Sequence, residues 1–131
     1  MIVIDTNLLV RLFTNDDKIQ ARYAEKLIEN NAIFISKSVL LETEWVLRYT
    51  YELNSNTICN AFENLLGLPR ITVEDPACII KIMNWYKSGL DFADAMHLAS
   101  SSLVTDEFAT LDKSFIKRAK KINIHLKTIT E

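Results

Sequence analysis

The sequence predicts an α/β fold in which a mostly parallel sheet is covered by helices on both faces. Short apolar, β-branched segments, typical of buried strands, alternate with segments of helical periodicity along the whole chain. Only two glycines and two prolines occur in 131 residues, so long flexible linkers are not expected. No repeat or low-complexity segment divides the chain. We therefore predict a single domain over residues 1–131.

Five segments have the composition of strands. The first ends at Asp5, which interrupts an apolar run directly after the N-terminus. The third and fourth are short, and the last lies close to the C-terminus. The predicted strands are Ile2–Ile4, Ala32–Ile35, Ile71–Val73, Phe108–Thr110 and Ile124–Ile129.

The segments between these strands have the periodicity and the end signals of helices. Ser36 or Ser38 can cap the third helix, Gly67 and Pro69 end the fourth, and Pro76 suits the first position of the fifth. Helices are expected from Asn7 to Phe13, from Asp16–Asp17 through Ile28, from Ser36 or Ser38 through Tyr51, from Thr57 to Leu66, from Asp75–Pro76 through Tyr86, within GLDFADAMHLASSS at residues 89–102, and from Asp112 to Lys121.

The net charge, the cysteine spacing and the apolar segments limit the class of protein. A net charge of -2 argues against nucleic-acid binding through overall charge, so such a partner must meet a local patch or a metal. Cys59 and Cys78 lack CxxC spacing, which indicates neither a zinc site nor a disulfide framework. The start MIVIDTN has no basic leader, and no apolar stretch approaches membrane-spanning length. A soluble, cytoplasmic protein without membrane contact is expected.

Acidic residues stand where the functional crevice of an open parallel sheet lies, beyond the carboxyl ends of the strands. Asp5 directly follows the first strand, Glu42 lies one turn into the helix after the second, and Asp112 follows the fourth by two residues. Asp91 and Asp94, three positions apart, point the same way from one helix. Converging carboxylates must be protonated or share a cation, and oxygen ligands suit Mg²⁺ or Mn²⁺. The pattern points to phosphodiester chemistry with a metal-activated water.

Each acid also has a simpler interpretation. An Asp after a strand, such as Asp5, is commonly a turn or cap residue, and Asp91 and Asp112 can each be only a helix cap. Glu42 can be a solvated helical acid near Arg48. Asp94 is harder to explain in this way, because it lies inside a helix among apolar neighbours.

Other polar and aromatic residues leave alternatives open. The basic segment after Asp112 is either a solvated helix face or a phosphate-contacting patch. The residues of that segment are Lys113, Lys117, Arg118, Lys120 and Lys121. His97 follows Asp94 by three residues and extends a DxxDxxH pattern. Three residues at that spacing turn progressively around the helix and do not share one face, so we interpret His97 as structural. Trp45, Tyr49, Tyr51 and Trp85 are expected in the core or in a subunit interface rather than as platforms on which bases stack.

Four segments together resemble a PIN domain, and more narrowly a VapC-type toxin ribonuclease of a bacterial toxin–antitoxin pair. They are IVIDTNLLVRLF, SVLLETEWVL, GLDFADAMHLA and FATLDKSF, in the order and spacing of that family over essentially the whole chain. The resemblance implies a three-layer α/β/α sandwich. It also implies an endoribonuclease dependent on Mg²⁺, with Mn²⁺ as a substitute.

The resemblance further implies roles for individual residues and partners. Asp5, Glu42, Asp94 and Asp112 match the family's acidic quartet of catalytic and metal-binding residues; Thr6, Asn7, Asp91 and Thr110 match its supporting or substrate-binding positions. Asp106 and Glu107 are alternatives for the last acid. RNA as substrate, a small antitoxin as inhibitor and a homodimer are implied as partners.

Three rival functions make different demands on the sequence. A phosphatase with Asp5 as nucleophile would want an acid at position 7, where Asn7 stands, and a phospho-acceptor domain would want an acid pair after the first strand. A non-catalytic PIN-fold module that binds RNA or protein is the main alternative. Metal titration separates it from a nuclease.

Overall fold

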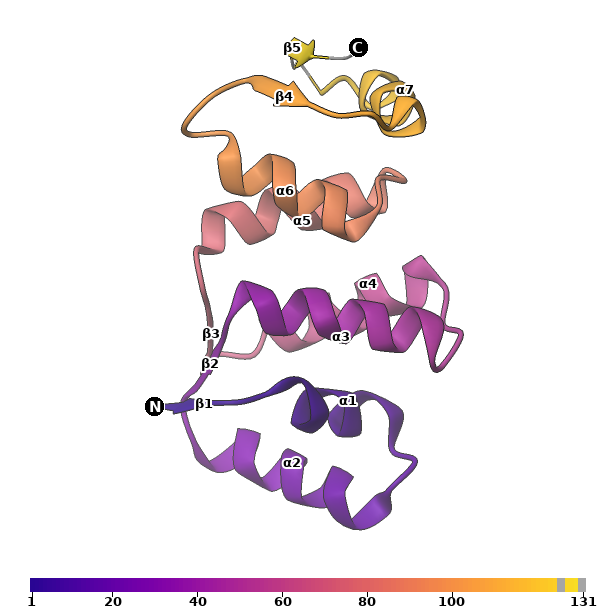
Figure 1. Ribbon diagram of the computed structural model, residues 1–131. Coiled ribbons are helices and arrows are strands. Elements are labelled where there is room, and N and C mark those ends of the chain that lie inside the picture. Colours follow the sequence, from indigo (N-terminus) through magenta and orange to yellow (C-terminus); the bar gives the residue numbers. More distant parts are fainter. Residues whose placement is uncertain (125–126, 130–131) are drawn as a thin grey trace. The chain divides into compact units, whose positions relative to one another are not determined.

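A computed structural model describes residues 1–124 and 127–129 of the chain. The chain forms two compact units, Met1–Pro76 and Ala77–Glu131, called here the first and the second unit. The described residues form seven helices and five strands in alternation, as the α/β prediction requires (Figure 1). The single-domain organisation stays a prediction.

A parallel three-stranded sheet organises the first unit. Its order is β1-β2-β3, and Ile33 of β2 is paired with Ile2 on one side and with Ile71 on the other. Ile33 and Ile35 are fully buried, which explains why the central strand is apolar without interruption. The strands are β1 (Ile2–Val3), β2 (Ile33–Ile35) and β3 (Ile71–Val73), close to their predicted bounds.

Four helices connect and cover these strands. Side chains at each N-cap accept a hydrogen bond from a backbone N–H of the first turn, because those amides have no partner inside the helix. Ser36 rather than Ser38 caps the third helix. The helices are α1 (Thr6–Thr14), α2 (Lys18–Asn30), α3 (Lys37–Tyr49) and α4 (Ser55–Leu66). Their buried faces include Leu9, Leu47 and Phe62.

The second unit contains three helices and a pair of parallel strands. They are α5 (Pro76–Lys87), α6 (Phe92–Ser101), β4 (Glu107–Ala109), α7 (Lys113–Lys121) and β5 (Lys127–Ile129), with β4 paired to β5. β4 ends one residue earlier than predicted, because the Thr110 hydroxyl accepts a hydrogen bond from the Asp112 N–H at 3.0 Å and starts a turn. Residues 125–126 of the predicted last strand lie outside the described residues.

The core of the second unit forms where α5 meets α6. Gly89 makes the turn between these helices at φ +105°, a conformation that side chains rarely allow. The rings of Tyr86 and Phe92 then pack edge to face with centroids 5.1 Å apart. Leu90 and Leu98 are also buried in this unit. None of the helices among the described residues is long and apolar enough to cross a membrane.

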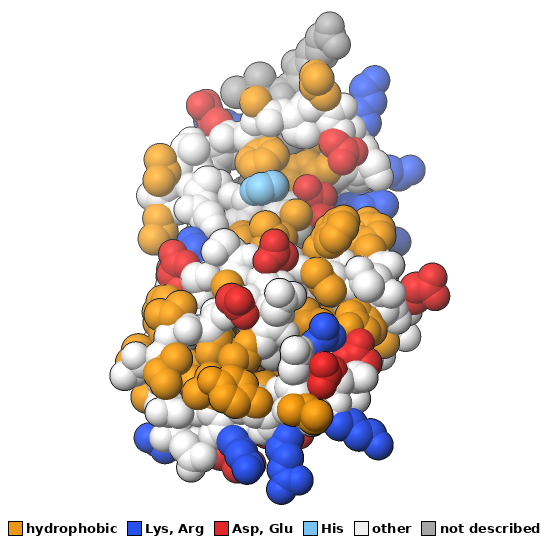
Figure 2. All heavy atoms as spheres, turned by 60° about the horizontal axis from the view of Figure 1, so that its bottom comes forward, with side chains coloured by type: hydrophobic (Ala, Val, Ile, Leu, Met, Phe, Trp, Pro, Cys, Tyr) orange, Lys and Arg blue, Asp and Glu red, His pale blue; other side chains and the backbone are white. Residues whose placement is uncertain are grey.

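Several large hydrophobic side chains remain on the surface. Figure 2 shows such side chains interspersed with charged ones on one face. Trp45 and Tyr49 of α3 are 54% and 59% exposed, so they do not belong to the core of the first unit. The centroids of their rings lie 5.3 Å apart, and the Arg48 guanidinium lies 4.7 Å from the centroid of the Tyr49 ring.

Candidate functional site

The acids singled out by the sequence are divided between the two units. Asp5 and Glu42 belong to the first unit, whereas Asp91, Asp94 and Asp112 belong to the second. Each set is held by the start of a helix that follows a strand or a tight turn.

Asp5 stands at the carboxyl end of β1, as predicted, and caps α1. Its Oδ1 accepts a hydrogen bond from the Leu8 N–H at 3.0 Å. Its Oδ2 accepts none from the described residues. Thr6, the next residue, is buried, whereas Asp5 and Asn7 are exposed. The cap therefore fixes one carboxylate oxygen and leaves the other for a ligand.

Glu42 is exposed on α3, one turn after the Ser36 cap. The expected neighbour Arg48 pairs with Glu44 instead, through its Nε at 2.9 Å from a Glu44 carboxylate oxygen. Glu44 is 1% exposed, and its burial did not emerge from the sequence. The i,i+4 spacing of Glu44 and Arg48 was the available signal.

Asp91 and Asp94 have different roles at the start of α6. The Asp91 Oδ2 accepts hydrogen bonds from the N–H groups of Ala93 and Asp94, at 3.1 and 3.3 Å, so Asp91 is the N-cap. Asp94 lies inside the first turn and is half-buried. The prediction that Asp94 is the less easily explained of the two agrees with this geometry.

The surroundings of Asp94 disfavour its charged form. Burial raises the pKa of the Asp94 carboxyl, and the negative charges of Asp91 and Asp112 raise it further. His97 and Arg118 act in the opposite direction, with smaller effects on this pKa. The second unit thus holds a half-buried carboxylate whose charged form is disfavoured by two other acids.

Asp112 is the acid after β4 whose negative charge raises the pKa of Asp94. It caps α7, with its Oδ1 accepting from the Phe115 N–H at 3.0 Å, and its own N–H is held by the Thr110 hydroxyl. The alternatives Asp106 and Glu107 line a cavity at the start of β4, and neither contributes to the shifted pKa of Asp94. The resemblance assigned the fourth acidic position to Asp112, and this assignment stays a prediction.

Capping and metal binding are compatible uses of these carboxylates. A carboxylate offers about four acceptor positions, and a cap occupies only one or two of them. Among the described residues, no three His, Cys, Asp or Glu side chains are grouped so as to hold a metal ion. The donors are nevertheless all oxygens, as Mg²⁺ and Mn²⁺ prefer, and a cation would relieve the repulsion that raises the Asp94 pKa.

The chain was compared with models of known protein families, with curated proteins and with solved structures. The family model of the PIN domain matches residues 2–121, which includes parts of both units and every acid discussed above. Nothing matches the chain among curated proteins or among solved structures. PIN domains are typically metal-dependent nucleases, and PIN nucleases bind RNA. With nearly all of its length matched by that model, the chain belongs to the PIN domain family.

Proposed function

We propose that this protein is a metal-dependent endoribonuclease, and that it serves as the toxin of a toxin–antitoxin pair. The observation that carries the proposal is the position of Asp94, a half-buried carboxylate in the first turn of α6, whose pKa is raised by burial and by the charges of Asp91 and Asp112. Perturbed acids of this kind gather at functional sites, because structural carboxylates are normally given hydrogen-bond donors or cations. Membership of the PIN family supports the same function.

Asp5, Glu42, Asp94 and Asp112 are the residues that we propose as ligands of Mg²⁺ or Mn²⁺. All four offer hard oxygen donors, which fits either ion. When bound, such an ion activates water as a nucleophile and stabilises charge on a phosphoryl group.

Other groups hold the proposed acids in position through hydrogen bonds. The Leu8 N–H fixes the Asp5 carboxylate, and the N–H groups of Ala93 and Asp94 fix that of Asp91. The Thr110 hydroxyl holds the backbone at Asp112. We propose Thr6 and Asn7, beside Asp5, as further groups that orient a carboxylate or the scissile phosphate. Fixed donors and acceptors lower the cost of reorganisation when charge moves to the phosphate.

The toxin role carries three further proposals. A small antitoxin protein would inhibit the enzyme, the protein would act as a homodimer, and it would work in the cytoplasm. Trp45 and Tyr49, exposed on α3, are compatible with a protein interface because aromatic side chains are enriched in such surfaces.

Cleavage of a labelled RNA in Mg²⁺, in Mn²⁺ and with EDTA tests the proposed function. The wild-type protein should cut with either metal and not with EDTA, and Asp5→Asn should abolish cutting. Asp17→Asn is a matched control, because Asp17 caps α2 through its Oδ1 as Asp5 caps α1. Both substitutions keep a capping oxygen and remove one charge. Cleavage by Asp5→Asn at the wild-type rate would refute the proposal.

A non-catalytic binding module is the second candidate. It is favoured by the capping roles of Asp5, Asp91 and Asp112, which would retain these residues without any catalysis. Such a module has no need of a divalent ion. Calorimetric titration with Mg²⁺ or Mn²⁺ therefore separates the two functions, since only the nuclease should bind the ion through its acids.

A further inference from the structure

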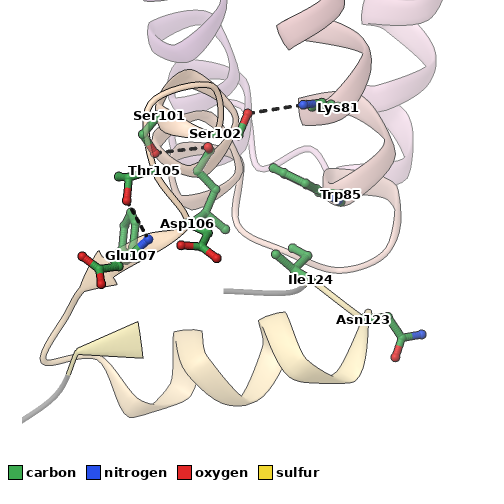
Figure 3. A pocket seen from close by; sticks show the side chains of 11 residues that line it. Lys81, Trp85, Ser101, Ser102, Thr105, Asp106, Glu107, Asn123 and Ile124 are labelled. Atoms are coloured by element: carbon green, nitrogen blue, oxygen red, sulfur yellow. Dashed lines mark hydrogen bonds between the residues drawn. The ribbon is translucent and has the colours of Figure 1, made fainter. Parts of the chain in front are cut away.

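The second unit contains a cavity of about 250 Å³ that none of the four proposed metal ligands lines, whereas Asp106 and Glu107, the alternatives for the last acid, do. It is formed by α5, the end of α6, the start of β4 and the segment directly after α7 (Figure 3). Trp85 extends into it from α5, and Asp106 and Ile124 approach it from other elements. At about 30 Å³ of liquid for each water, its volume corresponds to roughly eight waters. That is the scale of a small planar ring system.

Polar groups of both signs surround this apolar interior. The Lys81 Nζ donates to the Ser102 hydroxyl at 3.3 Å and is thereby held at the rim. The carboxylates of Asp106 and Glu107 are exposed at the opposite side, beyond Trp85. Two carboxylates against one ammonium repel a free anion such as phosphate. They attract a ligand that presents N–H groups.

We propose that this cavity binds a nucleobase of single-stranded RNA, away from the bond that is cut. A base can stack on the half-exposed Trp85 ring, an interaction available to every base. The carboxylate of Asp106 can accept from the exocyclic amino group of adenine, cytosine or guanine, a group that uracil lacks. The inference rests on the proposed function, because it concerns the RNA substrate.

Helix α7 provides a path from the acids to this cavity. It begins after Asp112, and Asn123, which lines the cavity, lies two residues beyond its end. At about 1.5 Å for each residue, its nine residues span about 14 Å. An RNA strand along α7 would therefore place a base in the cavity a few nucleotides from a phosphate at the acids.

The charges of α7 suit the phosphates of such a strand. The helix contains five basic residues and no acidic one, in a chain whose net charge is -2. Lys113, Lys117, Lys120 and Lys121 are all exposed and share one face, whereas Phe115 and Ala119 are buried on the other. This arrangement favours the phosphate-contacting interpretation over a merely solvated face.

A basic peptide is the competing occupant, because Trp85 and two carboxylates would also accept a guanidinium group. The lysine face of α7 argues against it, since it would repel a basic segment and attract phosphates. RNA satisfies both the cavity and the helix, whereas a basic peptide satisfies only the cavity.

Fluorescence of Trp85 tests the inference directly. The chain has two tryptophans, so Trp45→Phe leaves Trp85 as the only one, and Asp5→Asn keeps the RNA uncut. In this background, oligoadenylate and oligocytidylate should quench Trp85 saturably and bind more tightly than oligouridylate. Asp106→Asn, an isosteric change at an exposed side chain, should reduce that preference by about tenfold. An arginine-rich peptide should quench weakly.

Salt dependence tests the path along α7. Lys117→Gln should reduce the slope of log affinity against log salt by about 0.7 for a single strand. Lys26→Gln, an exposed lysine of α2 in the first unit, should leave the slope unchanged. Equal slopes for Lys117→Gln and the wild type would overturn the phosphate path.

The two proposals fail in different ways. If Asp5→Asn abolishes cleavage but Asp106→Asn leaves the base preference and Trp85 quenching unchanged, the cavity inference is wrong and the nuclease stands. Quenching by the arginine-rich peptide and not by RNA would also overturn the cavity inference. If Asp5→Asn cleaves like the wild type, the proposed nuclease fails whatever Trp85 reports. Circular dichroism confirms that each variant is folded.

Discussion

Asp16 in the first unit and Asp94 in the second are two carboxylates with opposite surroundings. The Tyr51 hydroxyl donates to Asp16 at 2.7 Å, the Arg11 guanidinium lies at 2.9 Å, and the Thr14 hydroxyl adds a third donor. These groups lower the pKa of Asp16, with the Tyr51 hydrogen bond as the largest cause. Asp94 instead lies near two other acids, and burial together with their charges raises its pKa.

The difference separates a structural acid from a candidate functional one. Donors that reach Asp16 from α1 and from the segment after α3 make its charged form part of what holds the first unit together. The neighbours of Asp94 disfavour its charge, and among the described residues His97 and Arg118 oppose them. In the proposed nuclease, a bound cation would compensate the repulsion that disfavours the charged form of Asp94.

Replacing Asp94 should give the largest effect on RNA cleavage and the clearest contrast with Asp16. Asp94→Asn should reduce RNA cleavage by more than the roughly 10–100-fold that loss of a supporting group costs. Its melting temperature without metal should equal or exceed that of the wild type. The raised pKa means that Asp94 contributes stability at low pH, which is lost as pH rises through its folded pKa, so its ionised form is destabilising at neutral pH.

Asp16→Asn is the matched control for that substitution. It removes the same charge where donors compensate it, so it should lower the melting temperature at neutral pH and leave cleavage intact. If Asp94→Asn melted lower than Asp16→Asn and still cut RNA, the contrast between the two acids would be wrong.

Thr110 tests whether positioning of Asp112 matters. Thr110→Val keeps the shape of the side chain but removes the acceptor of the Asp112 N–H, so cleavage should fall by about 10–100-fold. Thr110→Ser, which retains a hydroxyl, should recover most of the activity. Steady-state cleavage rates compare the three proteins, and equal rates for valine and threonine would remove Thr110 from the site.

Two substitutions separate the capping role of Asp91 from the effect of its charge. Asp91→Ser can still cap α6 and should be nearly as stable as the wild type, whereas Asp91→Ala should lose about 1 kcal/mol of unfolding free energy. Both remove a like charge and should lower the pKa of Asp94, which carboxyl NMR titration measures. A large loss of cleavage by Asp91→Ser at full stability would make Asp91 a direct participant.

The smallest effect is expected at Tyr51. Tyr51→Phe removes the main cause of the lowered Asp16 pKa, so that pKa should rise toward its ordinary value while cleavage is unchanged. A lowered pKa gives stability above the unfolded pKa that is lost as pH falls through the folded one. The melting difference between Tyr51→Phe and the wild type should therefore be present at neutral pH and vanish in acid. A difference that grew in acid would contradict this account.

Local patterns were enough to predict most elements of the fold. Strands such as Ile33–Ile35 are continuous β-branched runs, and caps such as Asp17 and Asp91 are chemically distinctive. The end of β4 was misplaced by one residue, because a hydroxyl-to-backbone bond at Thr110 decides it and composition does not. Ser36 and Ser38 were equally suited to cap α3, and only the backbone path selected Ser36.

The candidate site was predictable in its residue types and less so in its contacts. The sequence singled out Asp94, but the effect of Asp112 on it, rather than of Asp106 or Glu107, required the fold of the second unit. Glu44 was missed because a buried glutamate beside an arginine has the same pattern as a solvated pair. The cavity was also missed, since its lining comes from four separate segments with no shared motif.

Calorimetric titration with Mn²⁺ tests most directly the proposal that Asp5 and Asp94 are metal ligands. The metal-free wild type should bind Mn²⁺, and Asp5→Asn and Asp94→Asn should each weaken binding by more than about tenfold. Wild-type Mn²⁺ affinity in both Asp5→Asn and Asp94→Asn would contradict the proposal.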